Sequence, residues 1–146
     1  MSDSSSYMTP EEINAYAVRR FGINDTADRS LAQLAYQRSM DRNQYGADQS
    51  KLNRMWDQNY NGMHGGFAKR NLFNSGVYKQ AGTDYGINRS NALSDFTRQY
   101  TARQGGYDIT QANIDSSRTN SNNQIEAEKQ ASQAARAAQI RGAQGQ

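Results

Sequence analysis

The chain has 146 residues, a net charge of +3 and no cysteine, which suits one small domain or a few long helices. Leu, Ile, Val and Phe together number 18, about 12% of the chain and below the ~20% under which a stable core becomes difficult to build. The composition therefore excludes a disulfide framework and thiolate metal binding, and it argues against an ordinary hydrophobic core. We expect neighbouring molecules to supply part of the buried surface.

Helix signals dominate the sequence, and no strand-like alternation with turn chemistry appears. We therefore expect an elongated all-α protein with no β-sheet. No run approaches the ~18 apolar residues of a membrane span, so no span is expected. The first residues, 1–8, have neither the charged nor the apolar region of an export signal and are predicted to form a tail.

The first predicted element is a short helix over residues 9–22. Thr9 is suited to the N-cap, Pro10 to the first helical position, and Glu12 to the closing position of a capping box. Apolar residues follow at helical spacing. Gly22 is predicted to end this helix, because glycine commonly occupies the position after the last helical turn.

Residues 23–115 are predicted to form a long αα-hairpin that docks on neighbours. One helix covers about 26–60, a bend covers about 62–76, and a second helix covers about 77–103. The glycine pair at 105–106 is predicted to be the next break. The bend is expected because small and flexible residues cluster there: Gly62, Gly65, Gly66, Ser75 and Gly76.

Residues 116–146 form a polar, Ala/Gln-rich C-terminal segment, predicted to be a helix or a tail. Helix propensity is high here, but large apolar side chains are almost absent. We therefore expect this segment to lack an adhesive face and to be ordered by neighbouring chains.

Large side chains in the hairpin recur every eleven residues in two series. Eleven residues make three helical turns, so each series follows nearly one face of a helix. This spacing favours a packing stripe that adheres to other proteins, although chance among 14 aromatic residues is the alternative. The stripe consists of Leu34, Tyr45, Trp56, Phe67 and Tyr78, and of Tyr85, Phe96 and Tyr107.

The sequence offers no catalytic, metal or cofactor site. His64, the one histidine, has no metal-binding or nucleophilic companions at a recognisable spacing, and we interpret it as a polar residue in a hinge. The glycines at 62–66 do not form a phosphate loop, because Lys69 and Arg70 have no following hydroxyl and no strand precedes them. We therefore predict that the protein is not an enzyme and uses no cofactor.

Positive charge is concentrated in residues 65–107, which carry a net charge of +4 with aromatic residues interleaved. Such a stretch can contact nucleic acid, because phosphates attract Lys and Arg and aromatic rings stack on bases. The favoured alternative is a solvated helix face whose aromatic residues pack on the partner helix. The basic residues are Lys69, Arg70, Lys79, Arg89, Arg98 and Arg103.

The segment from Phe67 to Tyr78, Phe-Ala-Lys-Arg-Asn-Leu-Phe-Asn-Ser-Gly-Val-Tyr, resembles a bend common in small virion proteins of tailed bacteriophages. In those proteins an A-x-R-G-L-x-x-S-G pattern joins two long polar helices. Asn71 replaces the usual glycine, and asparagine tolerates the same left-handed conformation. The resemblance implies a structural role in the virion, in the neck, the tail or the capsid interior. It also implies partners that include copies of the chain and portal, adaptor or tail proteins.

Three functions follow from these observations. The first is a multi-copy structural component of a tailed-phage virion, at the neck or portal–tail region or as an internal, ejected protein. The second is a nucleic-acid-binding or packaging protein that uses the basic stretch 69–103, with packaged DNA as its partner. The third is a scaffold or assembly chaperone that is absent from mature particles. None requires a small-molecule substrate.

Overall fold

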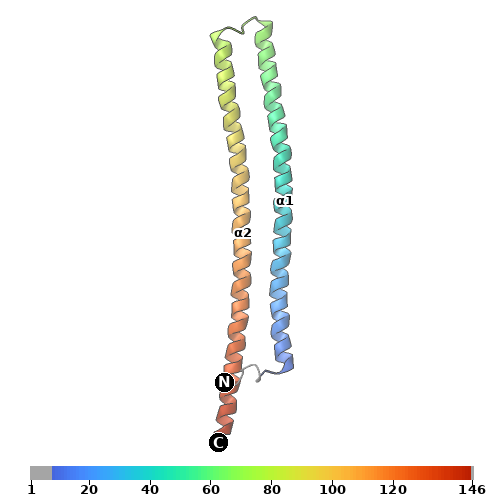
Figure 1. Cartoon of the computed structure of the whole chain (residues 1–146), viewed down its shortest axis with the longest axis vertical. Helices are drawn as coiled ribbons and strands as arrows, with labels where there is room; N and C mark the ends of the chain where they lie inside the picture. Colours follow the sequence, from blue (N-terminus) through green and yellow to red (C-terminus); the bar gives the residue numbers. More distant parts are fainter. Residues whose placement is uncertain (1–7, 146) are drawn as a thin grey trace. The chain divides into compact units, whose positions relative to one another are not determined.

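The computed structural model describes residues 8–145, which form two long helices packed as a hairpin (Figure 1). Helix α1 is Pro10–Lys69 and helix α2 is Gly76–Gln144. Residues 8–145 contain no β-strand. The all-α prediction is thus confirmed. No helix within this range is long and apolar enough to cross a membrane.

The start of α1 follows the predicted capping pattern. Pro10 is the first helical residue, and the Glu12 backbone N–H donates to Thr9 Oγ1 at 3.2 Å. Two glutamates in the first turn, Glu11 and Glu12, also complement the positive end of the helix dipole. The Glu12 carboxylate in addition accepts a hydrogen bond from Arg136 of α2, so this end of α1 is tied to the other helix.

The prediction of a separate helix ending at Gly22 is wrong, because α1 continues through Gly22 to Lys69. A helical glycine costs only about 1 kcal/mol relative to alanine, which flanking contacts can offset. Such contacts lie on both sides of Gly22. Arg20 pairs with Glu126 of α2, and Asn24 Oδ1 accepts a hydrogen bond from Asn122.

The connection between the helices is residues 70–75, which is shorter than the predicted bend at 62–76. Gly62, Gly65 and Gly66 lie inside α1, and Gly76 is the first residue of α2. Glycine can adopt helical backbone angles, so a cluster of glycines weakens a helix without necessarily ending it. The C-terminal boundary of the predicted bend therefore agrees closely with the structure, whereas its N-terminal boundary was placed too early in the chain.

A Schellman motif ends α1. The Leu72 N–H donates to the Phe67 carbonyl oxygen at 3.0 Å, and the Asn71 N–H donates to the Ala68 carbonyl oxygen at 3.1 Å. This pair of bonds requires a left-handed residue at the turn. Asn71 is this left-handed residue, with a φ of 54°. The sequence predicted this role, because asparagine stands there in place of the usual glycine.

Ser75 caps the start of α2. Its Oγ accepts a hydrogen bond from the Tyr78 N–H at 3.1 Å and donates to the Leu72 carbonyl oxygen at 2.6 Å. The same hydroxyl thus satisfies a free donor of α2 and an acceptor in the turn. These bonds define one turn conformation and so fix which residues of the two helices face each other beside it.

The predicted break at residues 105–106 is also wrong, since α2 runs without interruption to Gln144. The polar segment 116–146 is therefore helical in its described part. Its expected lack of an adhesive face is wrong too, because Ile125 is the most buried large side chain, with 1% exposure. One isoleucine that faces α1 was enough to provide a contact that composition did not reveal.

The chain divides into two compact units. Unit 1 is Met1–Ala35 with Ile109–Gln146, and unit 2 is Tyr36–Asp108. In each unit a part of α1 packs antiparallel to a part of α2. The buried apolar residues of the described chain all belong to unit 1, and residues 36–108 contain no fully buried side chain. These apolar residues are Met8, Ala27, Leu34 and Ile125.

The turn gives a direct test of the fold. Replacing Asn71 by valine should lower the free energy of unfolding by about 1–2 kcal/mol, because a β-branched residue resists the left-handed conformation. Asn71→Gly should leave the stability unchanged or raise it slightly. Urea denaturation followed by circular dichroism measures both. Equal stability of the valine and glycine variants would contradict the observed turn.

Candidate functional site

The interhelical face of unit 2 is built largely from aromatic rings. Tyr45 of α1 stacks on Phe96 with ring centroids 5.0 Å apart, and on Tyr100 at 4.0 Å. The Tyr45 hydroxyl also lies 3.3 Å from Thr97 Oγ1. One side chain of α1 thus contacts more than a full turn of α2, which resists sliding of the helices against each other.

A second aromatic group surrounds Tyr85 of α2. Its ring meets Trp56 at 5.3 Å in an edge-on arrangement and Tyr60 at 5.3 Å. The Tyr85 hydroxyl donates a hydrogen bond to the Trp56 carbonyl oxygen. Within the described residues the buried Trp56 Nε1 has no hydrogen-bond partner, so this tryptophan contributes through its ring.

The third aromatic group lies beside the turn, around Tyr78. Its ring contacts Phe67 at 5.2 Å and Phe73 at 5.4 Å, and its hydroxyl is 2.9 Å from His64 Nδ1. Desolvation raises the pKa of Tyr78, and the neighbouring Tyr60 acts in the same direction. His64 therefore lies inside α1, and its ring belongs to an aromatic cluster with Phe73 of the connection and Tyr78 of α2. Its interpretation as a hinge residue is wrong.

The predicted packing stripe lies largely between the helices of the chain itself. Tyr45 meets Phe96, Trp56 meets Tyr85, and Phe67 meets Tyr78, each across the interhelical face of unit 2. Leu34 is buried in unit 1, and Tyr107 is half-buried in unit 2. The eleven-residue spacing thus marks the face that each helix turns towards the other. Adhesion of the stripe to other proteins stays a prediction.

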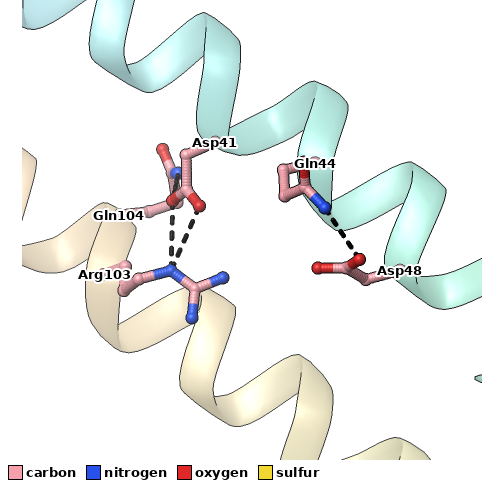
Figure 2. Close-up of polar contacts among 5 residues, drawn as sticks. All are labelled: Asp41, Gln44, Asp48, Arg103 and Gln104. Carbon is pink, nitrogen blue, oxygen red and sulfur yellow. Dashed lines mark hydrogen bonds and ion pairs between the residues drawn. The ribbon is translucent and has the colours of Figure 1, made fainter.

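Charged groups also connect the same two helices beside the aromatic groups. Asp41 of α1 accepts hydrogen bonds from Arg103 Nε, at 3.2 and 3.3 Å to its two oxygens, and from Gln104 Nε2 at 3.2 Å (Figure 2). On α1 itself, Gln44 Nε2 donates to Asp48 at 2.8 Å (Figure 2). The Asp41 side chain is only 14% exposed, so its two partners from α2 compensate for lost water.

These pairs change the interpretation of the basic stretch. Arg89 binds Asp57 at 2.9 Å, Arg98 lies 3.5 Å from Asp95, and Arg103 binds Asp41. Half of the six predicted nucleic-acid contacts are thus engaged within unit 2. Two of the acidic partners, Asp41 and Asp57, lie on α1 outside residues 65–107. The net charge counted over that stretch therefore did not include them. Folding the sequence about residues 70–75 would have placed them opposite the arginines.

The other three predicted contacts lie at the turn. Lys69 is the last residue of α1, Arg70 lies in the connection, and Lys79 lies in the first turn of α2. All three are exposed. None makes an ion pair with any part of the chain that the structure describes. Within the predicted basic stretch, the turn is therefore the place where positive charge remains available.

Unit 1 is held by a series of polar pairs around Ile125. Arg19 binds Glu128 at 2.6 Å, Arg20 binds Glu126 at 2.7 Å, and Arg118 binds Asp28 at 2.5 Å. Each pair joins α1 to α2. The cationic partner lies on α1 in two of them and on α2 in the third. This alternation favours one antiparallel register over a shifted one.

The carboxylates of two of these pairs titrate below their usual range. A hydrogen bond from Arg20 is the main cause that lowers the pKa of Glu126, and one from Arg19 does the same for Glu128. Burial opposes both shifts. The pKa of Arg19 is correspondingly raised by its hydrogen bond to Glu128.

A groove of about 710 Å³ follows one side of unit 1 between the helices. Small and polar residues dominate its walls, with Ala27 and two isoleucines among them. The sequence did not predict this groove, because glycine, serine and threonine at helical spacing carry no strong signal alone. Its lining includes Gly22, Ile23, Thr26, Ala27, Ser30, Ile114, Ser117 and Ser121.

Comparison with known protein families, with curated proteins and with solved structures gives no match. Residues 8–145 also contain no group of three or more His, Cys, Asp or Glu side chains that could hold a metal ion. The candidate functional features described above are surfaces: the interhelical faces, the groove, the exposed apolar side chains and the basic turn.

Two tyrosines of α1 separate interhelical packing from surface exposure. Tyr45→Ala removes a ring stacked on two rings of α2, and we expect it to lower the free energy of unfolding by about 2 kcal/mol. Tyr36→Ala, which changes a ring that is 66% exposed, should alter it by less than about 0.5 kcal/mol. Urea denaturation of dilute protein measures both changes, and equal effects would contradict the observed register.

The lowered pKa values predict an acid dependence of stability. A carboxylate whose pKa is lower in the folded state stabilises it above the unfolded pKa, about 4.3 for glutamate. That contribution is lost as the pH falls through the folded pKa. The Glu126→Gln/Glu128→Gln variant should therefore be less stable than the parent at neutral pH and equal to it in strong acid.

Urea titrations at several pH values measure this difference. Glu11→Gln is a suitable control, because it removes an exposed carboxylate of the first turn of α1. A stability gap between parent and double variant that stays constant down to strong acid would contradict the paired arrangement.

Proposed function

We propose that the protein is a multi-copy helical structural component of a tailed-phage virion. It packs at the neck or portal–tail region or serves as an internal, ejected protein. Its partners are copies of itself and portal, adaptor or tail proteins. In this proposal the chain acts through packing, and no chemical step is assigned to any residue.

The observation that carries the proposal is the scarcity of buried surface. Of the large apolar side chains in the described chain, only Met8, Leu34 and Ile125 are buried. Unit 2 has none, although it contains 73 residues, from Tyr36 to Asp108. Burial of apolar surface is the main favourable term in folding. A chain that leaves so much of it outside gains stability when other helices cover it.

Apolar side chains on the outside provide material for such contacts. Unit 1 exposes Val18, Phe21 and Ile109, at 61%, 71% and 65%, and unit 2 exposes Tyr36 and Val77, at 66% and 68%. Full burial of one such side chain contributes roughly 1.5–3 kcal/mol. A few of these residues covered by a neighbour would therefore match the stability of a small domain.

The phage context rests on the turn. The residues that carry the resemblance, among them Leu72, Ser75 and Gly76, include the groups that form the observed connection, and Asn71 takes the left-handed role of the usual glycine. This agreement supports the proposed context. The position in the particle rests on the resemblance alone.

Mass spectrometry of purified particles of the phage that encodes this sequence tests the proposal. We expect the protein at several copies per particle. Its presence in precursor particles together with its absence from mature ones would overturn the structural role in favour of a scaffold or chaperone. Its absence from both would overturn the virion context itself.

Assembly can be tested on the purified protein. Phe21→Ser removes an exposed apolar ring without touching the interhelical faces, so we expect self-association to weaken at least tenfold, or about 1.4 kcal/mol. Dilute stability should be unchanged. Analytical ultracentrifugation over a concentration series measures the association. A parent chain that stays monomeric and unfolds in one sharp transition would contradict self-association.

A further inference from the structure

The end of the hairpin around the turn carries positive charge without any carboxylate. Residues 58–83, named here the turn end, contain Lys69, Arg70 and Lys79 and no Asp or Glu. Of the flanking acids, Asp57 binds Arg89. Asp84 accepts a hydrogen bond from the neutral Gln80 at 2.9 Å and forms no ion pair with the cations of the turn end in the part of the chain that the structure describes. The charge of the turn end is therefore not neutralised by its own surroundings.

The backbone adds to this positive character. The first turn of α2 has no acidic residue, so the positive end of the helix dipole is uncompensated there. The N–H of Tyr78 already donates a hydrogen bond to Ser75 Oγ. Gly76 and Val77 at the helix start are exposed. The exposed amides of Asn71 and Asn74 lie beside them. The surface consequently offers cations together with neutral hydrogen-bond donors.

We propose that the turn end binds the phosphate groups of a nucleic-acid backbone. Phosphate oxygens accept hydrogen bonds and carry negative charge, which matches both properties of this surface. The rest of the basic stretch contributes little, because Arg89, Arg98 and Arg103 are paired with carboxylates. The binding surface is thus smaller than residues 69–103 and lies at one end of unit 2.

An acidic membrane surface is the competing polyanion, and the turn end suits it less well. Membrane attachment by a few cations needs apolar side chains that insert as well. Val77 is strongly exposed, but Phe73 is 38% exposed and its ring contacts His64 and Tyr78. One free aliphatic side chain is a weak wedge, so electrostatic contact with phosphates dominates.

The expected binding is weak and depends steeply on salt. Three cations that each neutralise one phosphate give a slope of log affinity against log salt of about −2.7 for duplex DNA, and about −2 for a single strand. This interaction needs no assembly of the protein, so it stands or falls separately from the proposed structural role.

Fluorescence anisotropy with a short labelled DNA duplex, titrated at several salt concentrations, tests the proposal. The test variant is Lys69→Gln/Arg70→Gln/Lys79→Gln. The matched control is Arg42→Gln/Lys51→Gln/Arg54→Gln, which removes the same charge from exposed positions of α1 in unit 2. We expect the test variant to lose at least tenfold in affinity at low salt and most of the salt slope. The control should keep both within about threefold.

Equal losses in the two variants would overturn the proposal, since net charge alone would then explain binding. Absence of DNA binding by the parent chain at low salt would overturn it as well. Sedimentation with anionic phosphatidylserine vesicles completes the test. Binding to vesicles that exceeds binding to DNA, and is lost in the test variant, would assign the turn end to a membrane surface instead. Circular dichroism confirms that both variants remain helical.

Discussion

The interhelical face of unit 2 carries stacked rings and charge pairs, and that of unit 1 carries charge pairs around Ile125, where a helical protein usually has a continuous apolar core. Such a face holds two helices in register because each contact has a specific partner: Tyr45 with Phe96 and Tyr100, Asp41 with Arg103. It contributes less to stability, because exposed ion pairs are weak and screened by salt. The contacts between the helices therefore determine the register of the pair well but contribute only modestly to its stability.

Because the contacts between the helices contribute little stability, the apolar side chains on the outer surface become important. Helices whose mutual contacts are ring contacts and polar pairs leave other apolar side chains on the outside, as Phe21 and Val77 show. A neighbour that covers these residues adds hydrophobic stabilisation to a register already set within the chain. A chain of this kind would gain stability on assembly without a change in the pairing of its helices.

Local chemistry was predictable from sequence where a few adjacent residues decide it. Thr9 and Pro10 indicated the start of α1, and Asn71 indicated the left-handed turn position. The breaks expected at Gly22 and at residues 105–106 were wrong, because helix-breaking tendency is weak compared with contacts on both sides. Ile125 and the charge pairs were missed for another reason. Their importance depends on what lies opposite, and that is known only once the turn and the register are fixed.

The register also limits how a gene for this chain can change in length. Adding one residue to α1 within unit 2 would rotate every position beyond it by about 100° and turn the aromatic rings away from α2. Eleven added residues make three turns and restore the face. A matching insertion in α2 is then needed to keep Tyr45 opposite its partners. Insertions and deletions in unit 2 are thus tolerated as paired steps close to whole numbers of helical turns, of which eleven residues are one.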